Sequence, residues 1–592
     1  MQPPVCEASL DRPPGSMAMP NAVHRSEKHE WKFTAQNTLT GTGPKMPPLT
    51  EEPEDSQISQ EKPFSVMGDN GAKHQTGMKL FWIVLALCLS VFLEALAARI
   101  QLTGGHNSPD LTIVTTAIPT ITDHFHSLQD VGWYGSAYLL TSASLQLLFG
   151  RIYSQFTIKW VYLSSIVIFE LGSLICGVAN QSSIFIIGRA IAGVGSAGIF
   201  TGSLVILSQS VRLERRPFFT GIIGSMYGIA SVVGPVLGGI FANKLTWRWC
   251  FLINLPLGAV AALVIITLLE PTRHSGEQDT KANRLRQCDP FGSVLFIAAT
   301  VCLLLALQWG GTQHDWNSWR VILLFCSFGI LILVFVLVQY IRQECATVPP
   351  RIFLQRTVWS SSLFGFCLGG AALSSVYFLP IWFQAVKGVS PVVSGFMMLP
   401  ILISFALVSV LSGILVTVAG YYTPFMLAGT VFCSFAYGLM STATPDTSML
   451  TWVGYQILAG AGAGFATNQC LIAIQVVLDT DDIPTGTALV FFFRILGSAI
   501  FVSISDCVFT NKLRQLLLVN VPSLDPDVIL KAGATNFRDV VSLADQPAVL
   551  AAYNGAISKT FIVFAVISAV GIMGALSAEW KSVRASNESS KV

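Results

Sequence analysis

Apolar runs of about 20 residues recur along most of this 592-residue chain. An α-helix rises about 1.5 Å per residue, so such a run is long enough to cross a hydrocarbon core about 30 Å thick. Only 11% of the residues are charged, against about 25% in soluble domains, which is too few to cover a water-soluble fold. Because lipid offers the backbone no hydrogen-bond partners, the runs predict an all-α polytopic membrane protein.

The N-terminal segment of the chain is polar. Residues 1–78 are rich in Pro, Ser, Glu and Lys, contain no apolar core of a signal peptide, and predict a disordered tail. Six spans, a charged loop and eight further spans are expected after it. We place the fourteen spans near 79–98, 131–149, 160–178, 183–207, 218–242, 249–269, 291–308, 320–340, 359–384, 392–417, 423–440, 450–476, 485–510 and 560–578.

Lysine and arginine should gather in short cytoplasmic loops. With the N-terminus inside, the four loops assigned to the cytoplasm carry twelve of them, at 150–159, 209–217, 270–289 and 341–357. Of the short loops assigned to the outer side, 121–130 and 179–182 carry none and 243–248 carries two, so both termini are predicted to be cytoplasmic. The tripeptide 180–182 is an N-glycosylation sequence on the outer side, which makes Asn180 a candidate glycosylation site.

Six charged residues lie in or against the predicted spans: Glu94, Asp110, Glu170, Arg189, Arg494 and Asp506. Each would cost about 3 kcal/mol if it faced lipid at mid-depth, so we expect them to face the bundle interior or a wet cavity. Asp110 and Arg189 are assigned to proton coupling, because a desolvated carboxylate beside a movable cation can carry one proton per cycle. Structural ion pairs, or for Arg189 a hydrogen bond between helices, are the alternative.

Two stretches are rich in small residues. One surrounds Arg189 at 188–197, and the other covers 228–239 with Gly228, Gly234, Pro235, Gly238 and Gly239. Small residues let helices approach closely, and a proline removes a backbone donor, so the second stretch predicts a kink or a pliable contact.

In this order the motifs closely resemble those of the fungal fourteen-spanner drug:proton antiporters of the major facilitator superfamily. That family includes toxin-efflux pumps encoded with secondary-metabolite pathways. The resemblance covers about residues 79–580. It rests on the stretches 110–119, 189–197, 228–239, 247–258 and 377–384.

The resemblance implies the major facilitator superfamily fold, which has two six-helix bundles around a central cavity and moves by rocking. The bundles would be 79–269 and 359–578, the second with a long outer loop at 511–558. A cytoplasmic loop and two linker spans (270–358) would lie between them, and 579–592 would be a cytoplasmic tail. In that family the arginine carried here by Arg189 is associated with proton coupling. As substrate-cavity residues we name Tyr377, Trp382, Gln384, Phe493 and Arg494, although helix packing is the alternative for each.

Two features depart from the family pattern. The loop motif Gly150, Arg151 and Lys159 has Ser154 where an aspartate is common, which puts its usual charge relay in doubt. Residues 97–109 look inserted, because reading Leu96 directly into Asp110 restores a continuous first span. Our hypothesis is a mis-spliced or mispredicted gene model.

The function expected is proton-coupled secondary active export of small, largely hydrophobic molecules such as a toxin, secondary metabolite or drug. The alternative is uptake, for example of a siderophore-iron chelate. An integral membrane enzyme or a receptor is a further alternative, but no cluster of His, Cys or acidic residues supports catalysis or a metal site, and no phosphate-binding loop indicates ATP. The proton gradient is the expected energy source, without a cofactor. A net charge of +2 gives no indication of nucleic acid. We expect a monomer in the plasma membrane, or alternatively in the vacuolar or another internal membrane.

Overall fold

The computed structural model describes residues 77–99, 130–271, 287–311, 313–522 and 524–584, together with residues 121, 124, 125 and 127. All but the last two residues of the predicted N-terminal tail lie outside this part of the chain, as do Asp110 and most of the inserted segment. The first helix continues through Arg99, so the start of that segment is helical.

Six long helical segments form the first half of the described molecule. They are α1 (Met78–Arg99), α3 (Val131–Gln155), α4 (Ile158–Val178), α5 (Ser182–Ser210), α6 (Arg216–Lys244) and α7 with α8 (Trp249–Leu252 and Asn254–Leu268). Two linker spans follow, α10 (Pro290–Trp309) and α11 (Trp319–Arg342). A short 3-10 turn, η3 (Leu213–Arg215), leads into α6.

The second half again has six long segments. They are α13 (Arg356–Ala385), α14 with α15 (Pro391–Met397 and Leu399–Ala419), α16 (Thr423–Met440), α17 with α18 (Met449–Thr467 and Gln469–Val477), α19 (Ile483–Asn520) and α21 (Gln546–Ser577). Three short elements join them: η4 (Gln343–Cys345), α12 (Pro350–Phe353) and α20 (Pro526–Val540).

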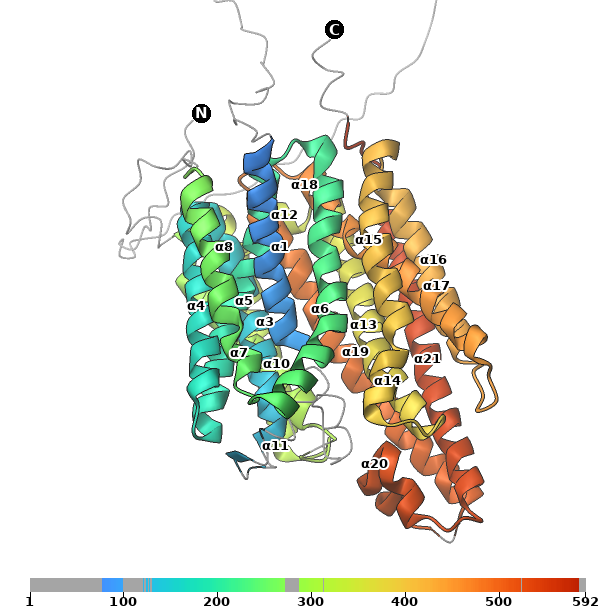
Figure 1. Cartoon of the computed structure of the whole chain (residues 1–592). Coiled ribbons are helices and arrows are strands. Elements are labelled where there is room, and N and C mark those ends of the chain that lie inside the picture. The colour runs from blue at the N-terminus through green and yellow to red at the C-terminus, as the bar shows by residue number, and fades with distance from the viewer. Residues whose placement is uncertain are drawn as a thin grey trace, which may run out of the picture. The chain divides into compact units, whose positions relative to one another are not determined.

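The long segments alternate in direction, so α1 begins and α21 ends at the same end of the bundle (Figure 1). We call this the terminal end and the other the opposite end. Within the described residues, thirteen helical segments are long and apolar enough to cross a membrane. The fourteenth is α3, which has 25 residues but a more polar sequence. The predicted all-α polytopic fold is confirmed, and thirteen of the fourteen predicted spans meet this criterion of length and hydropathy.

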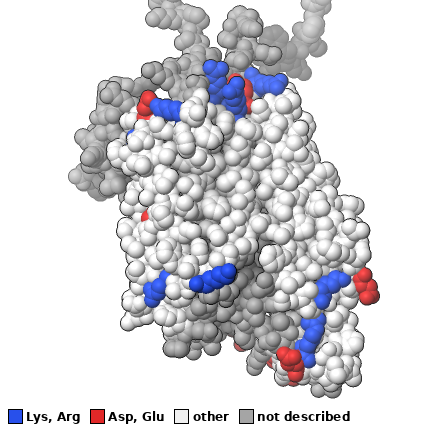
Figure 2. Space-filling view, in the orientation of Figure 1, with Lys and Arg blue, Asp and Glu red and all other residues white. Residues whose placement is uncertain are grey.

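The outer surface suits a lipid environment. Figure 2 shows lysine, arginine, aspartate and glutamate gathered at the two ends of this face, with a broad band between them that is almost free of charge. Large apolar side chains are exposed along the outer helices, including Leu333 of α11 and Leu407 of α15. Contiguous apolar surface of this kind is expected where a protein contacts lipid.

The outer segment predicted at 511–558 is largely helical. Helix α19 continues to Asn520 and α21 begins at Gln546, so the connection is shorter and contains the helix α20. Polar residues such as Lys512 end the apolar run, but a helix can continue beyond the membrane where water solvates its side chains. Arg538 of α20 donates hydrogen bonds to the main-chain oxygens of Gln384 (3.3 Å) and Ala385 (2.7 Å), which ties this region to the end of α13. Its partial burial lowers the pKa of Arg538.

The two halves meet along two pairs of helices. Helix α6 packs against α15, and α3 packs against α19. The linker spans pack against each other, and α10 also contacts α3 and α19. The linker therefore lies beside one of the two seams between the halves.

Candidate functional site

A buried carboxylate lies at the centre of the first half. Glu94 of α1 is 5% exposed, and its side chain accepts hydrogen bonds from Ser196 Oγ of α5 (2.9 Å) and Tyr227 OH of α6 (2.6 Å). Tyr138 OH of α3 donates to the main-chain oxygen of Glu94 (3.2 Å). Four helices thus converge on one acidic residue, whose carboxylate accepts hydrogen bonds from two neutral hydroxyl groups.

Arg189 lies next to this group. Its side chain is 1% exposed, its Nε donates to Tyr134 O (3.0 Å), and its guanidinium lies 4.3 Å from the centre of the Tyr138 ring. Among the described residues, one of its terminal nitrogens has no hydrogen-bond acceptor. Tyr138 therefore connects Arg189 with Glu94, because its ring contacts the cation and its hydroxyl binds the main chain of Glu94.

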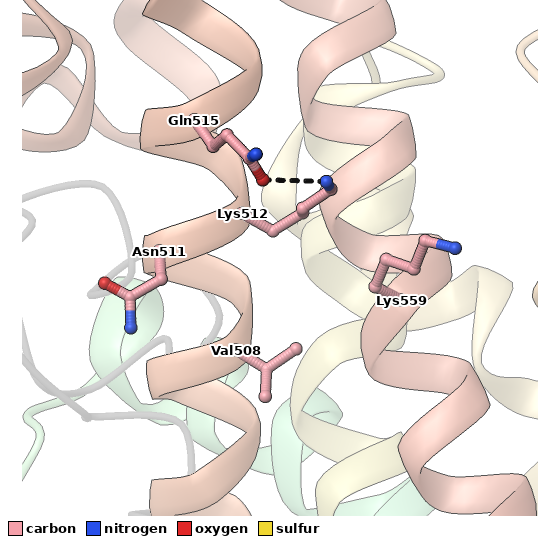
Figure 3. Close-up of a pocket in the computed structure, with 5 residues that line it drawn as sticks. All are labelled: Val508, Asn511, Lys512, Gln515 and Lys559. Atoms are coloured by element: carbon pink, nitrogen blue, oxygen red, sulfur yellow. Dashed lines mark hydrogen bonds between the residues drawn. The ribbon is translucent and has the colours of Figure 1, made fainter.

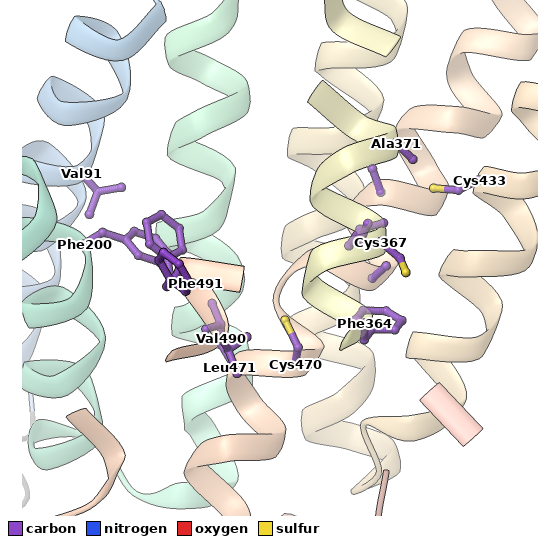
Figure 4. Close-up of a cluster of buried hydrophobic side chains, with 14 of the residues drawn as sticks. Val91, Phe200, Phe364, Cys367, Ala371, Cys433, Cys470, Leu471, Val490 and Phe491 are labelled. Atoms are coloured by element: carbon purple, nitrogen blue, oxygen red, sulfur yellow. The ribbon is translucent and has the colours of Figure 1, made fainter. Parts of the chain in front are cut away.

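An aromatic contact joins this group to the second half. Phe200 of α5 packs edge-on against Tyr227 (5.6 Å) and stacks on Phe491 of α19 (4.1 Å between ring centroids). Figure 4 shows the two phenylalanine rings together at the junction, with Leu471 and Val490 next to them. The guanidinium of Arg494 lies 5.8 Å from the Phe491 ring, and the Arg494 charge is within electrostatic range of Tyr227. The junction thus combines apolar rings with charged groups from both halves.

At the terminal end the halves are in close contact. A Cβ on Gly150 of α3 would lie 2.5 Å from the Cβ of Ala488 of α19, and Ser154 Oγ is 3.1 Å from Thr485 Oγ1. On the other seam, Ser409 Oγ of α15 donates to Gly221 O of α6 (3.1 Å). No side chain larger than hydrogen fits at Gly150 or Gly221 without displacing the partner helix.

The loop motif binds backbone rather than a carboxylate. Arg151 Nε donates to Gln287 O (3.2 Å), and its NH2 group donates to Glu344 O, so Arg151 contacts the segments flanking both linker spans. Lys159 Nζ donates to Ile266 O and Leu269 O, each at 2.7 Å, at the end of α8. The absence of an aspartate at Ser154 thus coincides with contacts to the linker.

An ion-pair group extends this contact to the second half. Arg351 lies 3.2 Å from a carboxylate oxygen of Glu344 and 2.7 Å from one of Asp482, just before α19. Hydrogen bonding to Asp482, with a further contribution from Glu344, raises the pKa of Arg351 above its usual range. The guanidinium therefore stays charged, and it bridges the linker to α19.

The five predicted cavity residues do not form one group. Phe493 stacks on Phe353 of α12 (6.2 Å between ring centroids), and Arg494 follows it on α19. Trp382 donates from Nε1 to Asn554 Oδ1 of α21 (2.9 Å), and Gln384 donates from Nε2 to Ser394 Oγ of α14 (2.9 Å).

Tyr377 lies within electrostatic range of Asp506. Because Arg494 is near the middle of the bundle and Trp382 and Gln384 are near the opposite end, a shared cavity for all five stays a prediction.

The other predicted positions are placed as follows. Gly228 faces α15, where a Cβ would lie 2.9 Å from the Cβ of Ala406. Helix α6 is continuous through Gly234, Pro235, Gly238 and Gly239, and Gly234 and Gly238 are buried. Asn180 Oδ1 accepts a hydrogen bond from Arg248 (3.0 Å) in the short turn between α4 and α5. Glycosylation there stays a prediction.

One open hollow of about 430 Å³ lies between α19 and α21, away from the junction. Figure 3 shows its lining residues: Val508, Asn511, Lys512, Gln515 and Lys559, with Lys512 bonded to Gln515. Among the described residues no group of three or more His, Cys, Asp or Glu could hold a metal ion.

Comparison with known proteins identifies the family. The family model described as Major Facilitator Superfamily matches residues 87–502. The chain belongs to the major facilitator superfamily. Membership in this superfamily makes it a multi-pass membrane transporter of small molecules rather than an enzyme, as the sequence predicted.

Curated superfamily relatives match over most of their length. An MFS-type transporter astH from Aspergillus oryzae is 46% identical over 91% of this chain and 93% of its own. An MFS-type efflux pump MFS1 from Trichophyton rubrum is 48% identical over 86% of this chain and 93% of its own. An aspyridones efflux protein from Neocamarosporium betae is 41% identical over 95% of this chain and 94% of its own.

Solved structures show the same fold. The proton:xylose symporter XylE aligns with a TM-score of 0.55 at 11% identity, over 86% of this chain and 98% of that chain. The human organic anion transporter MFSD10 aligns with a TM-score of 0.51 at 13% identity, over 83% of this chain and 100% of that chain. At such low identity these matches establish the superfamily fold alone.

Sequence reasoning identified Glu94 as a charge within a span but did not assign it to the site. Its partners Ser196 and Tyr227 are 102 and 133 positions away, and neither residue type stands out in an apolar run. The one available signal was the position of Tyr227 directly before Gly228 in the small-residue motif.

Proposed function

We propose that this chain exports small, largely hydrophobic molecules, such as fungal secondary metabolites or toxins, in exchange for protons. The observation that carries the proposal is 41–48% identity across nearly the whole length of relatives that include named efflux proteins. The two alignments cover 86% and 95% of this chain.

The junction of the halves is chemically suited to such substrates. Phe200, Tyr227 and Phe491 provide adaptable apolar surface, and Arg494 and Glu94 offer charge nearby. At the terminal end, Gly150 of α3 packs closely against Ala488 of α19. Alternating access requires that these contacts open during the cycle.

Proton coupling is the second part of the proposal, with Asp110 and Arg189 as its residues. The burial of Arg189, together with its unfilled hydrogen-bonding capacity among the described residues, supports a cation that can change partners during transport. The proton gradient would then supply the energy without a cofactor.

Further proposals follow from the same sequence patterns. The chain acts as a monomer in the plasma membrane, with both termini cytoplasmic and a glycan at Asn180. The vacuolar or another internal membrane is the alternative location. The surplus of Lys and Arg at the terminal end supports the orientation.

Transport into inside-out vesicles tests the function. Vesicles containing the full chain would be given an acidic lumen and offered rhodamine 6G or an aspyridone as the probe. We expect accumulation that a protonophore abolishes and that Arg189→Ala lowers at least about tenfold. Accumulation independent of the gradient would contradict proton coupling, and uptake of a ferric chelate by right-side-out vesicles instead would establish the import alternative.

A further inference from the structure

We infer that the hollow between α19 and α21 binds the phosphate group of an anionic phospholipid, with Lys512 and Lys559 as its cationic residues. This inference concerns the lipid around the transporter. It therefore goes beyond the proposed export and does not depend on the identity of the substrate.

The lining of the hollow is suited to a phosphate. Lys512 and Lys559 are cations, the side-chain amides of Asn511 and Gln515 offer further N–H donors, and none of the lining residues is acidic. Lys512 reaches from α19 toward α21 and its Nζ donates to Gln515 Oε1 (2.8 Å), which leaves the amide nitrogen of Gln515 able to donate (Figure 3). Donors without a negative charge among them favour a ligand of net negative charge over a zwitterionic one.

The positive charge of the hollow is not neutralised within the described part of the chain. Neither Lys512 nor Lys559 forms an ion pair with a described acidic residue. Arg514, two positions after Lys512, instead lies 2.5 Å from a carboxylate oxygen of Asp527 in α20. Asp506 is six positions before Lys512 and therefore lies on another face of α19, within electrostatic range of Tyr377 of α13.

Both lysines lie at the boundary between apolar and polar sequence. The span predicted at 485–510 ends two positions before Lys512, and the span predicted at 560–578 begins directly after Lys559. At this level a membrane protein meets the lipid headgroups, and lysine side chains extend to them. The hollow is therefore at the depth of the phosphate of a phospholipid.

Apolar side chains continue from the hollow toward the middle of the membrane. Val508 lines the hollow one helical turn before Lys512, and Ile504, one turn further, is 41% exposed. On α21, Ile562 and Val566 follow Lys559 and are 41% and 57% exposed. A lipid with its phosphate at the lysines would place its acyl chains along these residues, a contact that a free phosphate ion lacks.

The first test measures lipid binding by the purified full chain and needs no transport substrate. Native mass spectrometry would titrate the protein with dioleoylphosphatidylglycerol, and with dioleoylphosphatidylcholine for comparison. We expect the anionic lipid to bind first, with an apparent affinity that falls roughly tenfold in the double variant Lys512→Gln with Lys559→Gln, because both cations for the phosphate are lost.

Arg514→Gln is the matched control, since it removes a cation from the same helix outside the hollow, and it should leave the affinity unchanged. Neither lysine is buried, so the double variant should fold, which an unchanged Tm would verify. A double variant that binds the anionic lipid as tightly as the wild type would overturn the inference. An equal loss in Arg514→Gln would also overturn it, because the lipid would then respond to surface charge in general.

The second test uses the wild-type chain alone and locates the lipid. Hydrogen exchange would be compared between nanodiscs of dioleoylphosphatidylglycerol and of dioleoylphosphatidylcholine. We expect the anionic lipid to slow exchange in residues 511–520 and 555–562 and to leave α20 unchanged. Equal exchange of these residues in the two lipids would overturn the inference. Inorganic phosphate added to the phosphatidylcholine nanodiscs should have no effect, and protection of the same residues by it would show a site for a free anion in place of a lipid.

Discussion

Among the described residues, Glu94 and Glu170 are two carboxyl groups inside the first half of the molecule, and their surroundings differ. Glu94 is surrounded by helices α3, α5 and α6 and has hydroxyl partners on both oxygens. Glu170 of α4 packs against Gly258 of α8, and within the described part of the chain neither of its oxygens has a hydrogen-bond partner. Nearby, Asn254 Nδ2 donates to Ser173 Oγ (3.1 Å), whereas Asn254 Oδ1 has no hydrogen-bond partner among the described residues.

The two environments have different electrostatic consequences. An unpaired carboxylate in an apolar contact is costly, and this cost favours the protonated form of Glu170. Glu94 instead accepts hydrogen bonds from hydroxyl groups of α5 and α6, and α6 forms one of the two seams between the halves.

Replacing each acid with leucine should give opposite changes in stability, the largest effect expected here. Glu94→Leu leaves the Ser196 and Tyr227 hydroxyls without their acceptor and should cost about 2 to 4 kcal/mol. Glu170→Leu removes two unsatisfied oxygens and should stabilise by about 1 kcal/mol. Thermal unfolding of the purified variants in one detergent would measure both. The comparison breaks if the two Tm values move in the same direction.

The contact between Glu170 and Gly258 gives a second test. A Cβ on Gly258 would overlap Glu170 Oε1, so Gly258→Ala should destabilise the protein by about 1 to 3 kcal/mol. Shortening the acid makes room, and the double variant Gly258→Ala with Glu170→Ala should recover part of that loss. Gly329→Ala is the control, because a Cβ there would meet no atom within 4 Å. Additive losses in the double variant would show that the two side chains do not meet as described.

The sequence predicted the spans well because the membrane imposes a length and a composition on each of them. Thirteen of the fourteen coincide with helices long and apolar enough to cross a membrane, and the one predicted at 423–440 coincides with α16. The prediction failed where a helix leaves the membrane, as in α19 and α21, because there polar residues no longer mark a helix end.

The site was less predictable for a different reason. The position of Arg189 followed from the small residues around it, but its contact with Tyr138 depends on how α3 and α5 pack. The doubt about the charge relay at Ser154 agrees with the structure, where that residue meets a hydroxyl of Thr485. Nothing in the local sequence indicates that Arg151 contacts the segments flanking the linker spans.

Arg189→Lys tests whether the shape of the cation matters beside Glu94. Lysine keeps the charge but loses the planar group that stacks on Tyr138 and donates to Tyr134 O. We expect gradient-driven transport of rhodamine 6G to fall about tenfold at an unchanged amount of folded protein, a loss equivalent to about 1.4 kcal/mol. Initial rates in vesicles would measure it, with Lys387→Arg as a control remote from the junction. A variant with full activity would show that charge alone suffices at this position.

The exposed ion pairs of Arg351 should give the smallest effect. Its side chain is 54% exposed and that of Glu344 is 57% exposed, so water and salt screen the pair. Arg351→Gln should change stability by at most about 1 kcal/mol, and the change should shrink further in high salt. Thermal unfolding at low and high ionic strength would measure it, alongside transport rates. If Arg351→Gln instead reduced transport as much as Arg189→Lys, the bridge from the linker to Asp482 would belong to the transport cycle. The contrast would then lie between contacts that join moving parts and contacts that do not, whether buried or exposed.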